Sequence, residues 1–275
     1  MKKSSFMQKM INAPYILWSV LFIVAPLIMV FYYALTDKSG AFTVDNIVQI
    51  SEYTDTFILS ISYGAIATVI CLLIAYPFAY FLAQTKASFQ KVATMLVMLP
   101  MWMSFLIRTY SWITILGEQG VINNFLGMFG IEPLKMLNTG GAVILGMVYN
   151  FLPYMILPLY TSLQKMDNSL VEAAQDLGCN KFYCLRKVIF PLSVPGIASG
   201  VTMVFVPSVS TFYITQKLGG GQITLIGDII EGQFQTAYNY NVGAALSLVL
   251  MVMILICLGV LNYFADDDDE GGVLI

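Results

Sequence analysis

Long apolar intervals that lack charged residues recur along the whole chain. They lie at residues 15–35, 57–84, 92–116, 141–164, 188–216 and 232–265, and only the third contains a charged residue, Arg108. A membrane-spanning helix needs about 20 mainly apolar residues, so each interval is long enough to cross a bilayer. The pattern predicts an all-α integral membrane protein with six transmembrane helices and both termini on one side. The first interval is longer than the apolar part of a signal peptide, and we expect it to remain as a spanning helix.

The composition supports a membrane protein and narrows its chemistry. Of the 275 residues, 58% are hydrophobic and 11% are charged, and the mean hydropathy is +0.78. A soluble domain carries about a quarter charged residues. The formal charge of -3 implies no nucleic-acid partner. The chain has no histidine, the commonest general base and metal ligand, so we expect neither catalytic residues nor a metal site. Its four cysteines show no zinc or redox spacing and are expected to be free thiols.

The positive charges indicate which side of the membrane each loop faces. If the N-terminus is cytoplasmic, the inner segments hold Lys2, Lys3, Lys9, Lys86, Lys91, Lys165, Lys181, Arg186 and Lys187, and the outer segments hold Lys38, Lys135 and Lys217. Cytoplasmic loops carry an excess of Lys and Arg, so this orientation is the favoured one. We therefore expect both termini in the cytoplasm. The acidic tail, residues 266–275, is expected to be solvated and disordered.

One charged, helix-patterned segment, residues 169–191, interrupts the apolar chain on the predicted cytoplasmic side. Ser169 stands three residues before Glu172, which is the spacing of a capping box. The apolar face of the helix would hold Leu170, Ala173, Ala174 and Leu177. Gly178 suits a helix end that needs a positive φ, and Asn180 suits the cap of a second helix that runs to Pro191. Such a segment lies on lipid headgroups or docks into a partner, and the small alanines at its centre favour docking.

The stretch "EAAQDLG" followed by "CNKFYCLRKVIFP" resembles the EAA loop of permease subunits of ATP-binding-cassette importers. The matching positions are Glu172, Ala173, Ala174, Gly178 and Pro191. Val188 and Phe190 replace the Ile and Leu of the pattern conservatively. In that family the loop is a coupling helix that sits in a cleft of the cytoplasmic ATPase. The resemblance therefore implies an ATPase-coupling role for Ser169, Glu172, Ala173, Ala174, Asp176, Leu177, Gly178 and Pro191.

Further stretches narrow the resemblance to one subfamily. "LPMWMSFLIRTYSW", "GMVYNFLPYMILPLYTSLQKMDNSLVEAAQDLG" and "FPLSVPGIASG" resemble the PotB-type permeases of spermidine/putrescine importers. The resemblance implies a multi-pass subunit of the bacterial plasma (inner) membrane with a type I importer fold. It divides the chain into an N-terminal helix and loop (1–56), a permease domain (57–265) and the tail (266–275). A permease for another solute (an anion, an amino-acid-like compound or another cation) is the alternative.

The same resemblance implies several partners. They are a cytoplasmic ATPase dimer, a second homologous permease, an extracytoplasmic polyamine-binding protein and membrane lipid. The chain itself has no phosphate-binding loop, since "GGGQITLIGD" lacks the required Lys-Ser or Lys-Thr. We therefore expect no cofactor in this chain, with ATP and Mg bound by the partner ATPase. An intramembrane enzyme or a lone secondary transporter is disfavoured, because the apolar intervals contain no carboxylate.

A polar and aromatic set around Pro207 is the candidate solute pathway. Its members are Ser208, Ser210, Thr211, Phe212 and Tyr213, and Trp102, Tyr149 and Asn150 in the resembling stretches complete the candidates. Aromatic faces attract ammonium groups, and hydroxyl groups accept hydrogen bonds from them, which suits a polyamine. An outer aromatic belt with helix-packing hydroxyls is an equally good interpretation. Arg108 is a structural intramembrane charge that is expected either to reach the headgroups or to form an ion pair.

Overall fold

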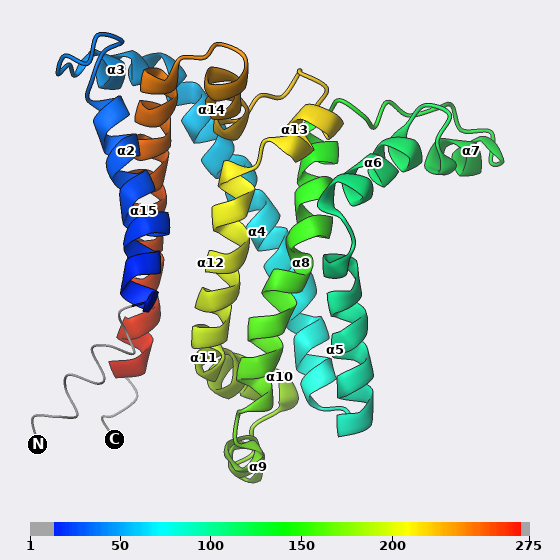
Figure 1. Cartoon of the computed structure of the whole chain (residues 1–275). Coiled ribbons are helices and arrows are strands. Elements are labelled where there is room, and N and C mark those ends of the chain that lie inside the picture. Colours follow the sequence, from blue (N-terminus) through cyan, green and yellow to red (C-terminus); the bar gives the residue numbers. More distant parts are fainter. Residues whose placement is uncertain (1–13, 271–275) are drawn as a thin grey trace, which may run out of the picture. The chain divides into compact units, whose positions relative to one another are not determined.

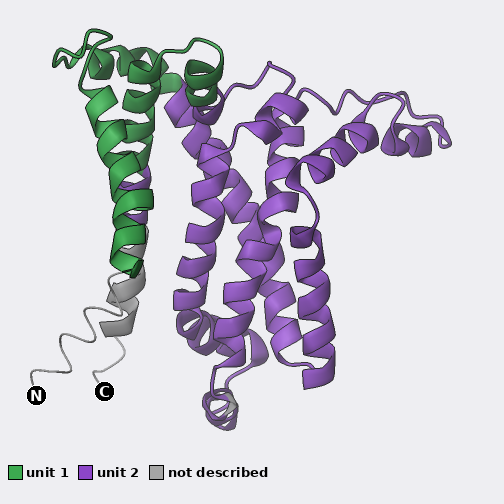
Figure 2. Cartoon of the chain, viewed as in Figure 1, with its two compact units in different colours: residues 1–55, 229–253 green, residues 56–228, 254–275 purple. Residues whose placement is uncertain are grey.

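The computed structural model describes residues 14–270, with side chains described except at residue 168 and at 261–270. Lys2, Lys3 and Lys9, which contribute to the predicted orientation, lie outside the described residues, as do residues 271–275 of the predicted tail. The chain forms two compact units (Figure 2). Unit 1 contains the residues up to Asp55 together with Ile229–Met253, and unit 2 contains Thr56–Asp228 and the residues from Ile254 onward.

Unit 1 is organised around the end of the first long helix. Its elements are η1 (Val20–Val24), α2 (Ala25–Ala34), α3 (Asp45–Val48), η2 (Gln49–Tyr53), the end of α14 (Ile226–Gln235) and the start of α15 (Tyr240–Glu270). The Thr36 carbonyl accepts hydrogen bonds from the amide of Asn46 at 2.9 Å and from that of Asn241 at 2.6 Å. Both asparagines are buried. Buried hydrogen bonds therefore join the chain after α2 to α3 and to α15.

Unit 2 is a bundle of helices in which α8 and α12 form the central pair (Figure 1). Its elements are α4 (Thr54–Ala83), α5 (Ala87–Trp102), α6 (Phe105–Leu116), α7 (Val121–Gly127), α8 (Gly140–Gln164), α9 (Asn168–Asp176), α10 (Lys181–Cys184), η3 (Leu185–Ile189), α11 (Phe190–Leu192), α12 (Val194–Ser210) and α13 (Tyr213–Leu218). Gly196 and Gly200, four residues apart on α12, meet α8 closely. Small residues at this spacing let two membrane helices approach.

The structure confirms a helical membrane protein and refines the predicted spans. Among the described residues, Pro14–Ala34, Asp45–Ala83, Gly140–Gln164 and Tyr240–Val260 are helices long and apolar enough to cross a bilayer. Two bent helix pairs raise the number to six if each pair is one span. The predicted intervals 15–35 and 141–164 agree with the observed helices to within one residue at each end. The described residues contain no strand beyond a single bridge between Thr36 and Phe42.

The third and fifth predicted spans are not continuous helices. Met103 and Ser104 adopt extended backbone angles, and the chain bends by 89° between Ala87–Trp102 and Phe105–Gly127. The fifth span bends by 66° after Leu192 and ends at Ser210, because Thr211 is extended, so the predicted end at residue 216 is wrong. Counting charges along the chain cannot detect such bends, since it records composition and not backbone angles.

The last span also differs from the prediction. Its helix begins at Tyr240, because the chain breaks after α14 and Tyr238 takes a φ of 50°. Residues 232–235, which the charge-free interval included, belong to α14. At the other end α15 continues to Glu270, so the predicted disorder from residue 266 is wrong for 266–270.

Proline explains two local departures from α-helical geometry. The π-helical segments η1 and η3 end just before Pro26 and Pro191. Proline has no N–H to donate to the preceding turn, and a π-helical turn is one way in which a helix accommodates such a gap. The prolines that the sequence places in the spans, Pro77, Pro100, Pro153, Pro158 and Pro207, all lie inside helices.

Candidate functional site

The segment between α8 and α12 folds as two short helices separated by a tight turn, as the sequence predicts. The first helix is α9, and the second runs through α10, η3 and α11. Figure 1 shows α9 at one end of unit 2, the end opposite to α6, α7 and α13. Residues 169–191 of this segment are called the coupling segment below.

The cap of α9 is Asp167, not Ser169. The Asp167 carboxylate accepts a hydrogen bond from the Ser169 N–H at 2.9 Å, and hydrogen bonds from Ser169 hold the pKa of Asp167 below its usual value. Ser169 lies inside the first turn, so the predicted capping box with Glu172 is wrong. Aspartate caps as well as serine does, and its charge interacts favourably with the N-terminal end of the helix dipole.

The turn after α9 has the geometry that the glycine predicted. Gly178 has a φ of +87°. Its N–H donates to the Gln175 carbonyl at 2.9 Å, and the next N–H, of Cys179, donates to Ala174 at 3.0 Å. These two hydrogen bonds define a Schellman motif, which ends a helix and reverses the chain. A side chain with a β carbon is strained at this φ, so glycine is required by the backbone itself.

The second helix is capped by Asn180, as predicted. Its side-chain oxygen accepts from the Tyr183 N–H at 2.8 Å. Cys179 precedes the cap and Cys184 is the fourth helical residue, which are the two positions of a hydrophobic staple. The Cys184 thiol also approaches the Val171 carbonyl at 3.8 Å, which connects α10 to α9. All four cysteines are free, in agreement with the prediction.

The coupling segment exposes an apolar surface. The Leu177 side chain is 90% exposed at the end of α9, and Leu170, Phe182 and Tyr183 are also exposed. Ala173 lies on the same open face of α9, whereas Val171 on the other face packs against the core of unit 2. Large apolar side chains exposed on one segment mark a surface that a partner or lipid covers.

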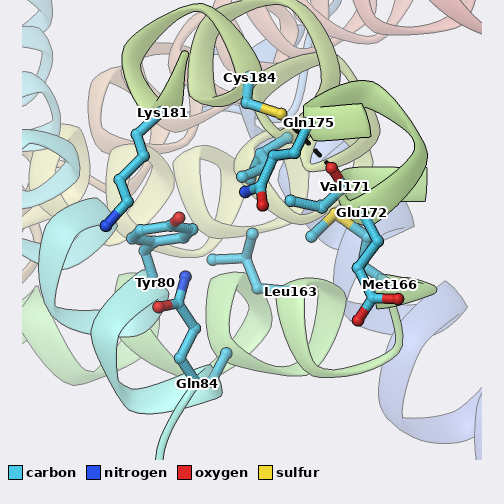
Figure 3. Close-up of a pocket in the computed structure, with 11 residues that line it drawn as sticks. Tyr80, Gln84, Leu163, Met166, Val171, Glu172, Gln175, Lys181 and Cys184 are labelled. Atoms are coloured by element: carbon cyan, nitrogen blue, oxygen red, sulfur yellow. Dashed lines mark hydrogen bonds between the residues drawn. The ribbon is translucent and has the colours of Figure 1, made fainter. Parts of the chain in front are cut away.

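A cavity of about 300 Å³ lies behind the coupling segment (Figure 3). Its walls come from the ends of α4 and α8 and from α9 and α10. Glu172, Gln175 and Lys181 line it from the coupling segment, and Tyr80 of α4 and Gln84, just after α4, line it from the other side. The cavity lies between α9 and the ends of α4 and α8.

A second contact anchors the end of the coupling segment to α4. The Tyr76 and Ser193 hydroxyl oxygens are 3.1 Å apart, and the Tyr76 ring lies 5.8 Å from the Phe190 ring between centroids. Ser193 is buried at the bend between α11 and α12. The coupling segment therefore packs against α4 at its end beside α12, whereas a cavity lies next to α9.

The predicted pathway residues divide into buried and exposed groups. Ser208, Thr211 and Asn150 are buried, and within the described residues the Ser208 hydroxyl and the Asn150 side-chain oxygen have no hydrogen-bond partner. Ser210 is exposed, and its hydroxyl donates back to the Val206 carbonyl at 3.0 Å. Buried polar atoms without protein partners are costly unless water or a ligand satisfies them.

The aromatic candidates do not form one cluster. Tyr149 packs edge-on against Trp112, and Tyr213 packs against two rings of α6, whereas Phe212 is exposed. Trp102 lines a separate shallow pocket with residues of α5 and α8 and is 69% exposed. Their roles as pathway residues stay predictions.

Arg108 is not at the surface. It is 7% exposed, and its Nε and Nη1 atoms have no hydrogen-bond partner among the described residues. The expectation that it reaches the headgroups is therefore wrong. A helical rise counted from Lys91 along one straight helix would place Arg108 near the outer boundary of the membrane, but the break at Met103 and Ser104 turns α6 to a new direction.

The structure adds two residues that the sequence analysis did not select, Tyr110 and Lys217. Tyr110 lies on α6 and its ring meets that of Tyr213 on α13. Lys217 follows Tyr213 by four residues, a spacing that brings two side chains together on a helix and that could have revealed this pair. The contribution of Tyr110 from α6 depends on tertiary packing, so no local pattern indicates it.

Residues 75–266 match the family described as "Binding-protein-dependent transport system inner membrane component". Among curated relatives, "Spermidine/putrescine transport system permease protein PotB" of Haemophilus influenzae is 37% identical over 267 residues, covering 94% of this chain and 93% of the relative. The protein of the same name from Escherichia coli K12 is 36% identical, with 84% and 88% covered. "Inner membrane ABC transporter permease protein YdcU" of E. coli K12 is 30% identical, with 76% and 71% covered.

Solved structures show the same fold at low sequence identity. A chain of a bacterial ABC transporter involved in import of the acidic polysaccharide alginate superposes with a TM-score of 0.78 at 19% identity, with 96% of both chains covered. A chain of an amino acid ABC transporter gives a TM-score of 0.51 at 17% identity, with 80% of this chain and 98% of that chain covered. The fold is therefore that of ABC importer permeases. The protein belongs to the family of inner membrane components of binding-protein-dependent transport systems, as a multi-pass permease subunit that is not itself the ATPase.

Proposed function

We propose that this chain is a permease subunit of an ATP-driven importer of polyamines, spermidine and putrescine. The observation that carries the proposal is the 35–37% identity to spermidine/putrescine permeases over most of both chains. The identity extends beyond the matched family region and includes the first span, because the first relative covers 94% of this chain.

The coupling segment is proposed to dock onto a cytoplasmic ATPase dimer that binds ATP and Mg. The exposed Leu177, Phe182 and Tyr183 supply apolar area for such a contact. The Schellman turn at Gly178 fixes the chain direction between α9 and α10. The Tyr76–Ser193 contact is proposed to carry a displacement of this segment to α4 and α12. The coupling residues named from the sequence therefore belong to a segment that the chain itself leaves open for a partner.

The proposed orientation follows from the positive charges. The coupling segment and both termini face the cytoplasm, and α6, α7 and α13 lie at the outer side. On that side an extracytoplasmic polyamine-binding protein would deliver the solute. A second homologous permease would complete the pathway, and lipid would cover the remaining apolar surface. Ser208, Asn150 and Thr211 are proposed to face the pathway, because two of them carry buried polar atoms without protein partners.

Uptake in cells tests the proposed solute. Cells in which this chain is the only polyamine permease of its kind should accumulate radiolabelled spermidine and putrescine, and its deletion should abolish that accumulation. Unlabelled polyamine should compete, whereas an amino acid or an oligosaccharide should not. Unchanged polyamine uptake in the deletion strain, with loss of uptake of another solute, would assign the chain to that solute.

A further inference from the structure

The ammonium group of Lys217 lies between two tyrosine rings in unit 2. Its Nζ atom is 5.5 Å from the ring centroid of Tyr110 and 5.7 Å from that of Tyr213. A cation within about 6 Å of a ring centroid is attracted by the negative face of the ring. The chain therefore already contains an aromatic site that holds a primary ammonium group.

The rings are held more firmly than the lysine. Tyr213 packs against Phe105 at 5.9 Å and against Tyr110 at 6.4 Å between ring centroids. The other face of α13 is fully buried through Ile214, Thr215 and Leu218, so the helix that carries Tyr213 is fixed. Lysine has a flexible four-carbon stem, and its loss from the site requires only rotation about side-chain bonds.

The site is open to molecules from outside the chain. The Tyr110 side chain is 51% exposed, and Tyr213 and Lys217 are both partly exposed. Each end of a polyamine is a primary alkylammonium group, which is chemically the same group as the one that Lys217 places there. A solute ammonium of this kind competes with Lys217 for the same two ring faces.

We propose that Tyr110 and Tyr213 form a binding site for a primary alkylammonium group, which Lys217 occupies until a solute ammonium displaces it. The inference rests on the proposed function for the nature of the solute. Beyond that function, the inference assigns an ammonium site to α6 and α13 and makes Lys217 a competitor that is attached to the chain. Lys217 then keeps the site filled when no solute is present, and its charge repels a solute ammonium unless the lysine leaves the rings.

The chemical reactivity of Lys217 reports whether it occupies the rings. Acylation requires access of the reagent to the amine, so Lys217 reacts slowly while its Nζ atom lies against the two rings. The complete membrane complex, without binding protein, would be treated briefly with an amine-acylating reagent, and modification of Lys217 quantified by mass spectrometry. Lys135, an exposed lysine of unit 2, serves as the internal control.

Spermidine or n-butylammonium should raise the rate of Lys217 acylation about two- to fivefold relative to sodium chloride at equal ionic strength, the range expected from one exposed cation–π contact. The rate for Lys135 should not change. In Tyr110→Leu, Lys217 should react faster without any added amine and respond less to it. Tyr110→Phe should behave like the wild type, because it keeps the ring, and it guards against a folding defect in the leucine variant.

Two results would overturn the inference. One is an equal rate of Lys217 acylation with and without alkylammonium, and the other is equal protection of Lys217 in wild type and Tyr110→Leu. Because butylammonium is not a polyamine and the readout is not transport, these results are independent of whether spermidine is the transported solute. If the transported solute is not a polyamine but alkylammonium still displaces Lys217, the ammonium site stands and only the solute that uses it changes.

Discussion

Replacing Leu177 by serine removes the most exposed apolar side chain of the coupling segment while leaving the fold of the chain unchanged. Leu177 is 90% exposed, so it contributes almost nothing to the core of unit 2. Full burial of a leucine side chain stabilises a contact by about 1.5–3 kcal/mol. If the ATPase covers Leu177, the substitution weakens docking by about 2 kcal/mol, which corresponds to a roughly 30-fold higher Kd.

The Kd would be measured by titrating the purified ATPase subunit onto the permease pair in nanodiscs. Met128→Ser is the matched control, because Met128 is also a large apolar residue and is 81% exposed, but it follows α7 at the opposite end of unit 2 (Figure 1). We expect a Kd close to that of the wild type for the control. An unchanged Kd for Leu177→Ser, or an equal loss in both variants, would refute docking on this surface.

Three further substitutions test the turn after α9, the packing of α12 on α8 and the buried hydrogen bonds of unit 1. Gly178→Val places a β-branched residue at a φ of +87° and should lower solute-stimulated ATP hydrolysis without reducing membrane insertion, as measured on purified complexes; normal stimulation would argue against the coupling role. Gly196→Ala brings a β carbon to 2.5 Å from the Ser162 β carbon, so it should lower the free energy of unfolding by about 1–3 kcal/mol and lower the Tm. In the control variant Gly259→Ala the new β carbon meets nothing within 4 Å, so the Tm should not fall. Asn241→Leu removes buried hydrogen bonds of unit 1 and should destabilise it by about 1 kcal/mol, and unchanged hydrogen exchange in residues 33–46 would contradict this.

The sequence predicted those features that depend on local chemistry. Gly178 and Asn180 were identified correctly, because a positive φ and a helix cap each place a strong demand on a single residue. The first and fourth spans were placed to within one residue at each end, because Pro14–Ala34 and Gly140–Gln164 are uninterrupted apolar helices. The cap of α9 was misplaced, since Asp167 and Ser169 are both good caps and only the backbone shows which one is used.

The features that depend on backbone direction or tertiary packing were beyond sequence reasoning. The bends at Met103 and at Ser193 leave the apolar composition unchanged, so a count of charge-free residues treats each bent pair as one helix. The contact of Tyr110 with Lys217 joins α6 to α13 and has no local signature in the sequence.

Transport by the purified complex tests polyamine import, and its coupling to ATP hydrolysis, in one measurement. Proteoliposomes would hold this chain with its partner permease and ATPase, with ATP inside and the binding protein with radiolabelled spermidine outside. We expect uptake that requires ATP and that unlabelled putrescine inhibits by competition. Gly178→Val should reduce both this uptake and ATP hydrolysis. ATP-driven uptake of another solute without uptake of spermidine would contradict the polyamine assignment, and full uptake with Gly178→Val would contradict coupling through residues 169–191.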